Sequence, residues 1–93
     1  MSGAPRRARK TDANQTMIVD ALRMIGVTVE VIENPLDLLC CHKNETFMLE
    51  VKTADGRLTK GQVEFMARWP GRVHIVRSVD EAMRAVLGEK VMA

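Results

Sequence analysis

The spacing of apolar residues changes along the chain and predicts the order of its elements. Between residues 11 and 25 apolar side chains recur three and four positions apart, which predicts a helix capped by Thr11 or Asp12 and ended by Gly26. Runs rich in β-branched and other apolar residues then predict three strands, over residues 27–32, 36–41 and 46–52. The polar residues 42–45 predict a tight turn, so the second and third strands should form an antiparallel hairpin.

The second half of the chain predicts two helices around one further strand. Thr59 is a good N-cap for a helix that runs to Trp69, with an inner stripe of Val63, Met66 and Ala67. Residues 72–77 alternate between apolar and polar and predict a fourth strand. Ser78 caps a last helix, whose apolar stripe consists of Val79, Met83, Val86 and Leu87. The order is α-β-β-β-α-β-α, an α/β fold with a mixed sheet flanked by helices, because a helical crossover makes the third and fourth strands parallel.

Composition excludes several classes of protein. A chain of 93 residues that is 46% hydrophobic and 28% charged is one globular domain. No apolar run approaches the roughly 20 residues of a membrane span, and the Arg-rich start lacks the apolar region of a signal peptide. We therefore expect a cytoplasmic protein with no membrane partner. Cys40 and Cys41 are adjacent, so a bond between them would be strained, and no Cys/His cluster has zinc spacing.

Charge is unevenly distributed along the chain, whose net charge is +2. Residues 1–10 carry no acid and four basic side chains: Arg6, Arg7, Arg9 and Lys10. A basic, flexible arm over residues 1–10, ahead of a single domain over residues 11–93, suits attraction to nucleic-acid phosphates. The alternative is a solvated leader that only aids solubility.

One face of the third predicted strand carries an acid and a lysine two residues apart. The odd-numbered residues of this strand are apolar and should pack under a helix, which places Glu50 and Lys52 on the opposite face. Both side chains are costly to bury unless they are paired or liganded. They either form a plain ion pair on a solvated face or belong to a site.

Asp37 on the preceding strand favours a site, because the predicted hairpin brings it alongside Glu50. Two converging carboxylates repel each other unless a cation lies between them, and hard oxygen ligands select Mg²⁺ or Mn²⁺. Such a metal activates a water molecule and offsets charge that builds on a phosphate. Lys52 would orient that water or stabilise the pentavalent phosphate. The three residues therefore predict a site that hydrolyses phosphodiester bonds.

Three segments resemble, in order, the motifs of the PD-(D/E)XK nuclease superfamily, and most of all its small phage and bacterial VRR-NUC-type members. They are Pro35-Leu36-Asp37-Leu38-Leu39, Leu49-Glu50-Val51-Lys52, and Leu58-Thr59 followed by Gln62 and Phe65. The resemblance runs from about residue 12 to residue 87. It implies a restriction-endonuclease-like core, Asp37 and Glu50 as metal ligands, and Lys52 as the catalytic lysine. The carbonyl of Val51 would be a further metal ligand. Gln62 would lie near the scissile phosphate, or else be an exposed helix position.

The chain departs from the family pattern in two places. Leu36 stands between Pro35 and the acid, where the family usually has a Pro-Asp dipeptide. The first predicted helix also lacks the Glu that many members use as a ligand, so only Asp12 or Asp20 could complete the site from that helix.

The resemblance implies a metal-dependent endodeoxyribonuclease of phage or prophage type in a bacterial or phage-infected host cell, acting on duplex or branched, structured DNA. Cutting both strands, or resolving a junction, needs two active sites, which a homodimer supplies most simply. One alternative is a catalytically impaired nucleic-acid-binding module of the same fold. Another is a protein–protein adaptor in which Glu50 and Lys52 merely pair on an exposed strand face.

Overall fold

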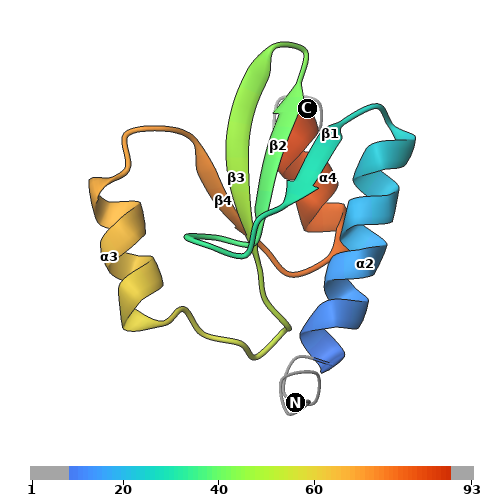
Figure 1. Ribbon diagram of the computed structural model, residues 1–93. Helices are drawn as coiled ribbons and strands as arrows, with labels where there is room; N and C mark the ends of the chain where they lie inside the picture. Colours follow the sequence, from blue (N-terminus) through green and yellow to red (C-terminus); the bar gives the residue numbers. More distant parts are fainter. Residues whose placement is uncertain (1–8, 89–93) are drawn as a thin grey trace.

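The computed structural model describes residues 9–88 as helices packed on both faces of one sheet (Figure 1). The order of elements is α-β-β-β-α-β-α, as the sequence predicts. In chain order they are α2 (Arg9–Met24), β1 (Thr28–Val31), β2 (Leu38–His42), β3 (Glu45–Val51), α3 (Lys60–Arg68), β4 (Val73–Val76) and α4 (Val79–Leu87).

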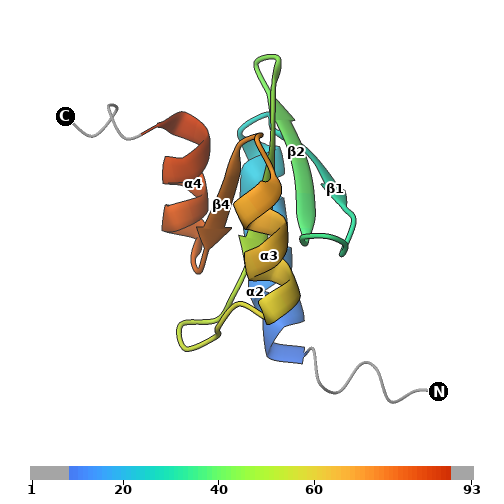
Figure 2. The ribbon, with the colours of Figure 1, turned by 90° about the vertical axis from the view of Figure 1, so that its left-hand side faces the viewer.

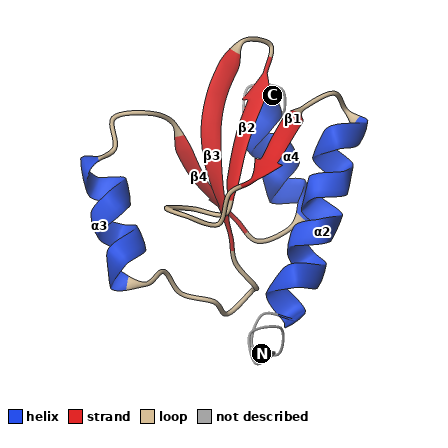
Figure 3. Cartoon of the chain, in the orientation of Figure 1, coloured by secondary structure: helices blue, strands red, loops and turns tan. Residues whose placement is uncertain are grey.

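The sheet has four strands in the order β1-β2-β3-β4. β1 pairs antiparallel with β2, and β2 with β3, so the first three strands form a meander. The β2–β3 hairpin turns through Lys43 and Asn44, which both have positive φ angles, and so confirms the predicted polar turn. α3 connects β3 to β4, and these strands run parallel as predicted. Figure 3 shows the resulting mixed sheet, with α2 and α4 beside it.

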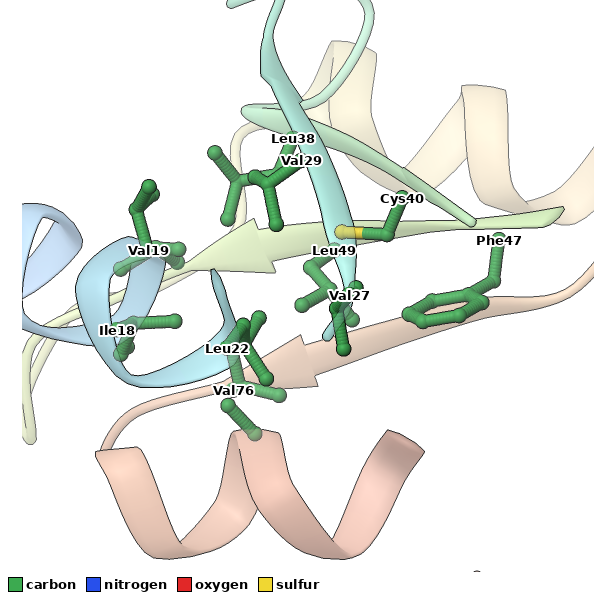
Figure 4. Packing of buried hydrophobic residues seen from close by; sticks show 12 residues of the cluster. Ile18, Val19, Leu22, Val27, Val29, Leu38, Cys40, Phe47, Leu49 and Val76 are labelled. Atoms are coloured by element: carbon green, nitrogen blue, oxygen red, sulfur yellow. The ribbon is translucent and has the colours of Figure 1, made fainter. Parts of the chain in front are cut away.

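The larger hydrophobic core lies between the sheet and helices α2 and α4. Phe47 and Leu49 of β3 belong to the same buried cluster as Ile18 and Leu22 of α2 (Figure 4). Val51 of β3 is a further buried member. Apolar side chains of α4 pack against the same cluster: Val79, Met83, Ala85 and Val86. The alternation predicted for the third strand is therefore correct, and it directs Glu50 to the opposite face.

α3 covers part of that opposite face (Figure 2). Its contact with the sheet is small: Phe65 packs on Leu36 and Met48, with Met66 and Val73 partly buried beside them.

The predicted inner stripe of α3 is wrong in two positions. Val63 is half exposed and Ala67 is exposed, whereas Phe65 is buried. The inward face instead follows Gln62, Phe65 and Met66, at helical spacing. The first inward-facing residue of α3 is the polar Gln62, so the pattern of apolar residues alone does not predict this face. At the end of α4, Leu87 is likewise exposed.

The caps of both later helices match their predicted residues. Thr59 and Ser78 have extended backbones, and each side chain accepts a hydrogen bond from the N–H three residues on, of Gln62 and Glu81 respectively. Gly26 ends the first helix with a φ of 94°, a conformation that favours glycine.

The first helix begins at Arg9, inside the predicted basic arm, so the predicted helix start at a Thr11 or Asp12 cap is wrong. Arg9 and Lys10 therefore belong to the helix backbone, since no capping residue or proline separates them from Thr11. The positions of Arg6 and Arg7 lie outside the described residues. Within residues 9–88 no helix is both long and apolar enough to cross a membrane.

Packing contacts explain the positions of the two cysteines and of His74. Cys40 is a buried core residue, Cys41 is half-buried, and both thiols are free. Burial raises the pKa of the Cys40 thiol to about 11, which keeps it protonated. His74 lies edge-on to Phe47, and its Nε2 accepts a hydrogen bond from Arg72.

Candidate active site

Asp37 and Glu50 lie side by side where β2 and β3 meet. β2 begins at Leu38, two residues later than predicted, so Asp37 directly precedes the strand. The register pairs Leu38 with Leu49, so its next step sets Asp37 opposite Glu50. The N–H of Asp37 donates to Oε1 of Glu50 at 3.2 Å, and Oδ2 of Asp37 accepts from the N–H of Val51 at 2.8 Å. The predicted proximity of the two acids is therefore confirmed.

The backbone before β2 folds back so that Asp37 faces β3. Pro35 has no N–H to give to a strand ladder. The carbonyl of Asp37 accepts hydrogen bonds from Ile32 and Glu33, at 2.9 and 3.2 Å, and so closes the loop that leaves β1. Leu36 is fully buried between the sheet and α3. Leu36 therefore anchors this loop.

Glu50 is the buried centre of the site, with only 2% of its surface exposed. Its Oε2 lies 3.2 Å from Nζ of Lys52 and accepts a hydrogen bond from Nε2 of Gln62 at 2.8 Å. With the N–H of Asp37, three donors surround this carboxylate. The alternative of a Glu–Lys pair on an exposed strand face is wrong, because Glu50 is inside the protein and the side chain of Lys52 is only 16% exposed.

Burial raises the pKa of the Glu50 carboxyl, and the nearby negative charge of Asp37 raises it further. Lys52 opposes both effects through its charge and its hydrogen bond, but the pKa remains above the ordinary value. Burial and the charge of Asp37 therefore outweigh the contacts by which Lys52 stabilises the ionised carboxyl.

Gln62 joins the start of α3 to Glu50. Its Oε1 accepts from the N–H of Thr59 at 2.9 Å, and Oγ1 of Thr59 accepts from the N–H of Gln62 at 3.1 Å, which completes a capping box. Since Oε1 is used in the cap, Nε2 is directed at Glu50. Of the two alternatives for Gln62, the structure supports a half-buried position at the site rather than an exposed helix position.

Asn14 of α2 reaches the same region and was not among the predicted site residues. Its Nδ2 donates to the carbonyl of Lys52 at 3.0 Å and to that of Arg77 at 3.3 Å. The N–H of Lys52 donates to the carbonyl of Val76 at 3.0 Å, so the backbone of Lys52 is held on both sides. A signal was present in the sequence: Asn14 precedes Ile18 by four residues and thus shares the buried face of the helix.

Neither acid of the first helix is shown at the site. Asp20 is exposed on α2, and no hydrogen bond or ion pair links it to the other described residues. Asp12 lies in the helix backbone, and its side chain is outside the described part of the chain.

The oxygen ligands of this site suit a hard divalent cation that takes only a few of its ligands from the protein. Among the side chains that the structure describes, those of residues 13–88, no group of three or more His, Cys, Asp and Glu could hold a metal ion. Asp37 and Glu50 nevertheless supply two adjacent carboxyl groups, and the pKa of Glu50 is raised by burial first and by the charge of Asp37 second. Mg²⁺ typically uses one or two carboxylates and keeps several waters, so these residues fit it. Val51 directly follows Glu50 in the chain, and its N–H donates to Asp37.

Comparison with protein-family models, with curated proteins and with solved structures finds no significant match. The chain's own features are therefore the basis for a function: its fold, its site geometry and the motifs that the site residues form.

Proposed function

We propose that this protein is a metal-dependent endodeoxyribonuclease that hydrolyses phosphodiester bonds of DNA. One observation carries the proposal: the buried carboxylate of Glu50 contacts Asp37, Lys52 and Gln62 together. These four residues come from three separate motifs of the sequence. A buried acid, a second acid and a lysine are the groups that metal-assisted phosphodiester hydrolysis needs.

The fold supports the assignment of this site to the PD-(D/E)XK superfamily. Three meandering strands, a helical crossover and a parallel fourth strand make up the described sheet. The order of elements, α-β-β-β-α-β, is the one that the resemblance implies for a restriction-endonuclease-like core. The resemblance of the motifs to those of VRR-NUC-type nucleases leads us to propose a phage or prophage type.

Each site residue has a distinct role in the proposed reaction. Asp37 and Glu50 would hold Mg²⁺ or Mn²⁺, with the carbonyl of Val51 as a further ligand. The bound cation would supply Lewis acidity toward water and phosphate. Lys52, whose backbone is held by Asn14 and Val76, would direct its ammonium at the phosphate oxygens and stabilise charge that builds on them. Gln62 would orient Glu50 through its amide.

The proposed substrate class rests on the resemblance, and the proposed assembly rests on the number of strands to be cut. Cleavage of both strands of a duplex, or of two arms of a junction, needs two such sites, so we propose a homodimer acting on duplex or branched DNA.

A second candidate function is a nucleic-acid-binding module of the same fold that has lost catalysis. Among the side chains of residues 13–88, no group of three metal-ligating residues is present, which favours it. This module would bind DNA without cutting it.

Incubation with labelled DNA separates these functions. Wild-type protein is mixed with a four-way junction and with linear duplex, in Mg²⁺, in Mn²⁺ and in EDTA, beside the Lys52→Ala variant to exclude a contaminating nuclease. The nuclease predicts cutting that requires metal and is lost in the variant. Metal-independent DNA binding without cutting would instead establish the binding module, and the preferred DNA would identify the substrate.

A further inference from the structure

The loop between Lys52 and Thr59 encloses an open hollow next to the candidate site. The hollow has a volume of about 810 Å³, and its lining consists of Ala54, Asp55, Gly56, Arg57, Leu58 and Arg77. Both ends of the loop connect to the site: Lys52 precedes it, and Thr59 follows it and shares the capping box with Gln62. The hollow is therefore formed by a loop whose two ends adjoin residues of the candidate site.

The loop is packed directly against Lys52. A methyl group placed on Gly56 would lie 3.4 Å from Cβ of Lys52 and 3.2 Å from Oγ1 of Thr53. The N–H of Gly56 donates to the carbonyl of Thr53 at 3.0 Å, which closes a tight turn. The wall of the hollow is thus continuous with the stem of the catalytic lysine.

Arg77 fixes the shape of this turn and leaves donors available. Its Nη1 donates to the carbonyls of Thr53 and Gly56, at 2.7 and 2.8 Å. Within the described part of the chain, Nε and Nη2 of Arg77 have no hydrogen-bond acceptor. A guanidinium that is held by one nitrogen and has free N–H groups is preorganised to bind an anion.

The lining charges favour an anionic ligand. Arg57 and Arg77 carry positive charge against the single carboxylate of Asp55. Arg57 is exposed and forms no hydrogen bond or ion pair with any other described residue, so its guanidinium is accessible. Phosphate oxygens are the anions that arginine binds best through paired N–H groups.

We infer that this hollow binds a phosphodiester group of the substrate DNA that flanks the one to be cleaved, with Arg57 and Arg77 as its ligands. The inference rests on the proposed function and adds a subsite to it. Binding there would set the position of the DNA backbone relative to Lys52 and Glu50. Arg57 would contribute only a contact with the phosphate, whereas Arg77 also holds the loop in shape. Arg57 is therefore the residue to substitute, because its loss should leave the loop intact.

The test measures DNA affinity without cleavage. Anisotropy of a labelled duplex is followed in EDTA over a series of NaCl concentrations, with the full-length wild-type chain and with Arg57→Gln. We expect the variant to bind several-fold more weakly, and its slope of log affinity against log salt to be smaller by about 1, because one phosphate contact is lost. Asp55→Asn should bind more tightly than wild type.

Arg68→Gln is the matched control, since Arg68 ends α3 and lies over the ring of Phe65, away from the loop. It should keep the wild-type slope. Equal losses in Arg57→Gln and Arg68→Gln, an unchanged slope in Arg57→Gln, or no binding by wild type would overturn the subsite. A parallel cleavage assay in Mn²⁺ keeps the two proposals apart. Binding that depends on Arg57 without cutting refutes the nuclease only, and cutting with Arg57-independent binding refutes the subsite only.

Discussion

Gln62 and Glu50 are linked by a hydrogen bond of 2.8 Å from an amide to a buried carboxylate. The same amide closes the capping box of α3 through its oxygen. The start of the helix and the acid at the centre of the site are thus held by one side chain, and a change at Gln62 affects both.

Gln62→Glu tests the hydrogen bond to Glu50 separately from the capping box of α3. A glutamate still accepts from the N–H of Thr59, but it replaces the donor to Glu50 with a second negative charge. We expect a loss of about 1–3 kcal/mol in the free energy of unfolding at pH 8. The loss should shrink as the pH falls and the carboxylates protonate. Urea denaturation at several pH values measures it.

Gln15→Glu, the same change at a half-buried position of α2, is the control and should have little effect. Equal stabilities of Gln62→Glu and wild type at pH 8 would contradict the contact.

The raised pKa of Glu50 predicts how stability depends on pH. A carboxyl whose pKa is higher in the folded state than the unfolded value of 4.5 holds its proton more tightly when folded. Its contribution to stability is therefore largest below pH 4.5 and falls as the pH rises through the folded pKa. The free energy of unfolding of wild type, minus that of Glu50→Gln, should decrease over this window. A difference that is constant or rises with pH would show that Glu50 is not shifted upward.

Asn14→Asp tests the bond that holds the backbone of Lys52. The aspartate has nearly the same shape but no N–H for the carbonyls of Lys52 and Arg77. We expect a loss of about 1–3 kcal/mol in the free energy of unfolding. If the protein is a nuclease, misplacement of Lys52 should also lower kcat by roughly tenfold or more while KM changes little. An Asn14→Asp protein with wild-type stability and kcat would remove Asn14 from the site.

Much of the fold could be predicted because its signals are local. The strands are stretches in which apolar and polar residues alternate or β-branched residues are frequent. The polar residues before Glu45 mark the turn of the hairpin. The proximity of Asp37 and Glu50 follows from that hairpin, since register is set by the turn and by the face that is buried.

Other features depend on contacts between distant parts of the chain and could not be predicted in this way. Asn14 meets carbonyls 38 and 63 residues away, so no local pattern reveals its partners. The inner face of α3 was misassigned because Gln62 is one of its members, held inward by Glu50 rather than by hydrophobicity. Arg77 holds a loop that precedes it by more than 20 residues.

Cleavage of a labelled duplex in Mn²⁺ by Glu50→Gln, compared with Glu64→Gln, tests the central claim most directly. Both variants remove one carboxylate, but Glu64 is an exposed residue of α3 and Glu50 is the buried centre of the site. The proposed nuclease predicts that Glu64→Gln cuts at the wild-type rate and that Glu50→Gln, although folded, is slower by about a hundredfold or more. Equal rates in the two variants, or no metal-dependent cutting by wild type, would contradict the account.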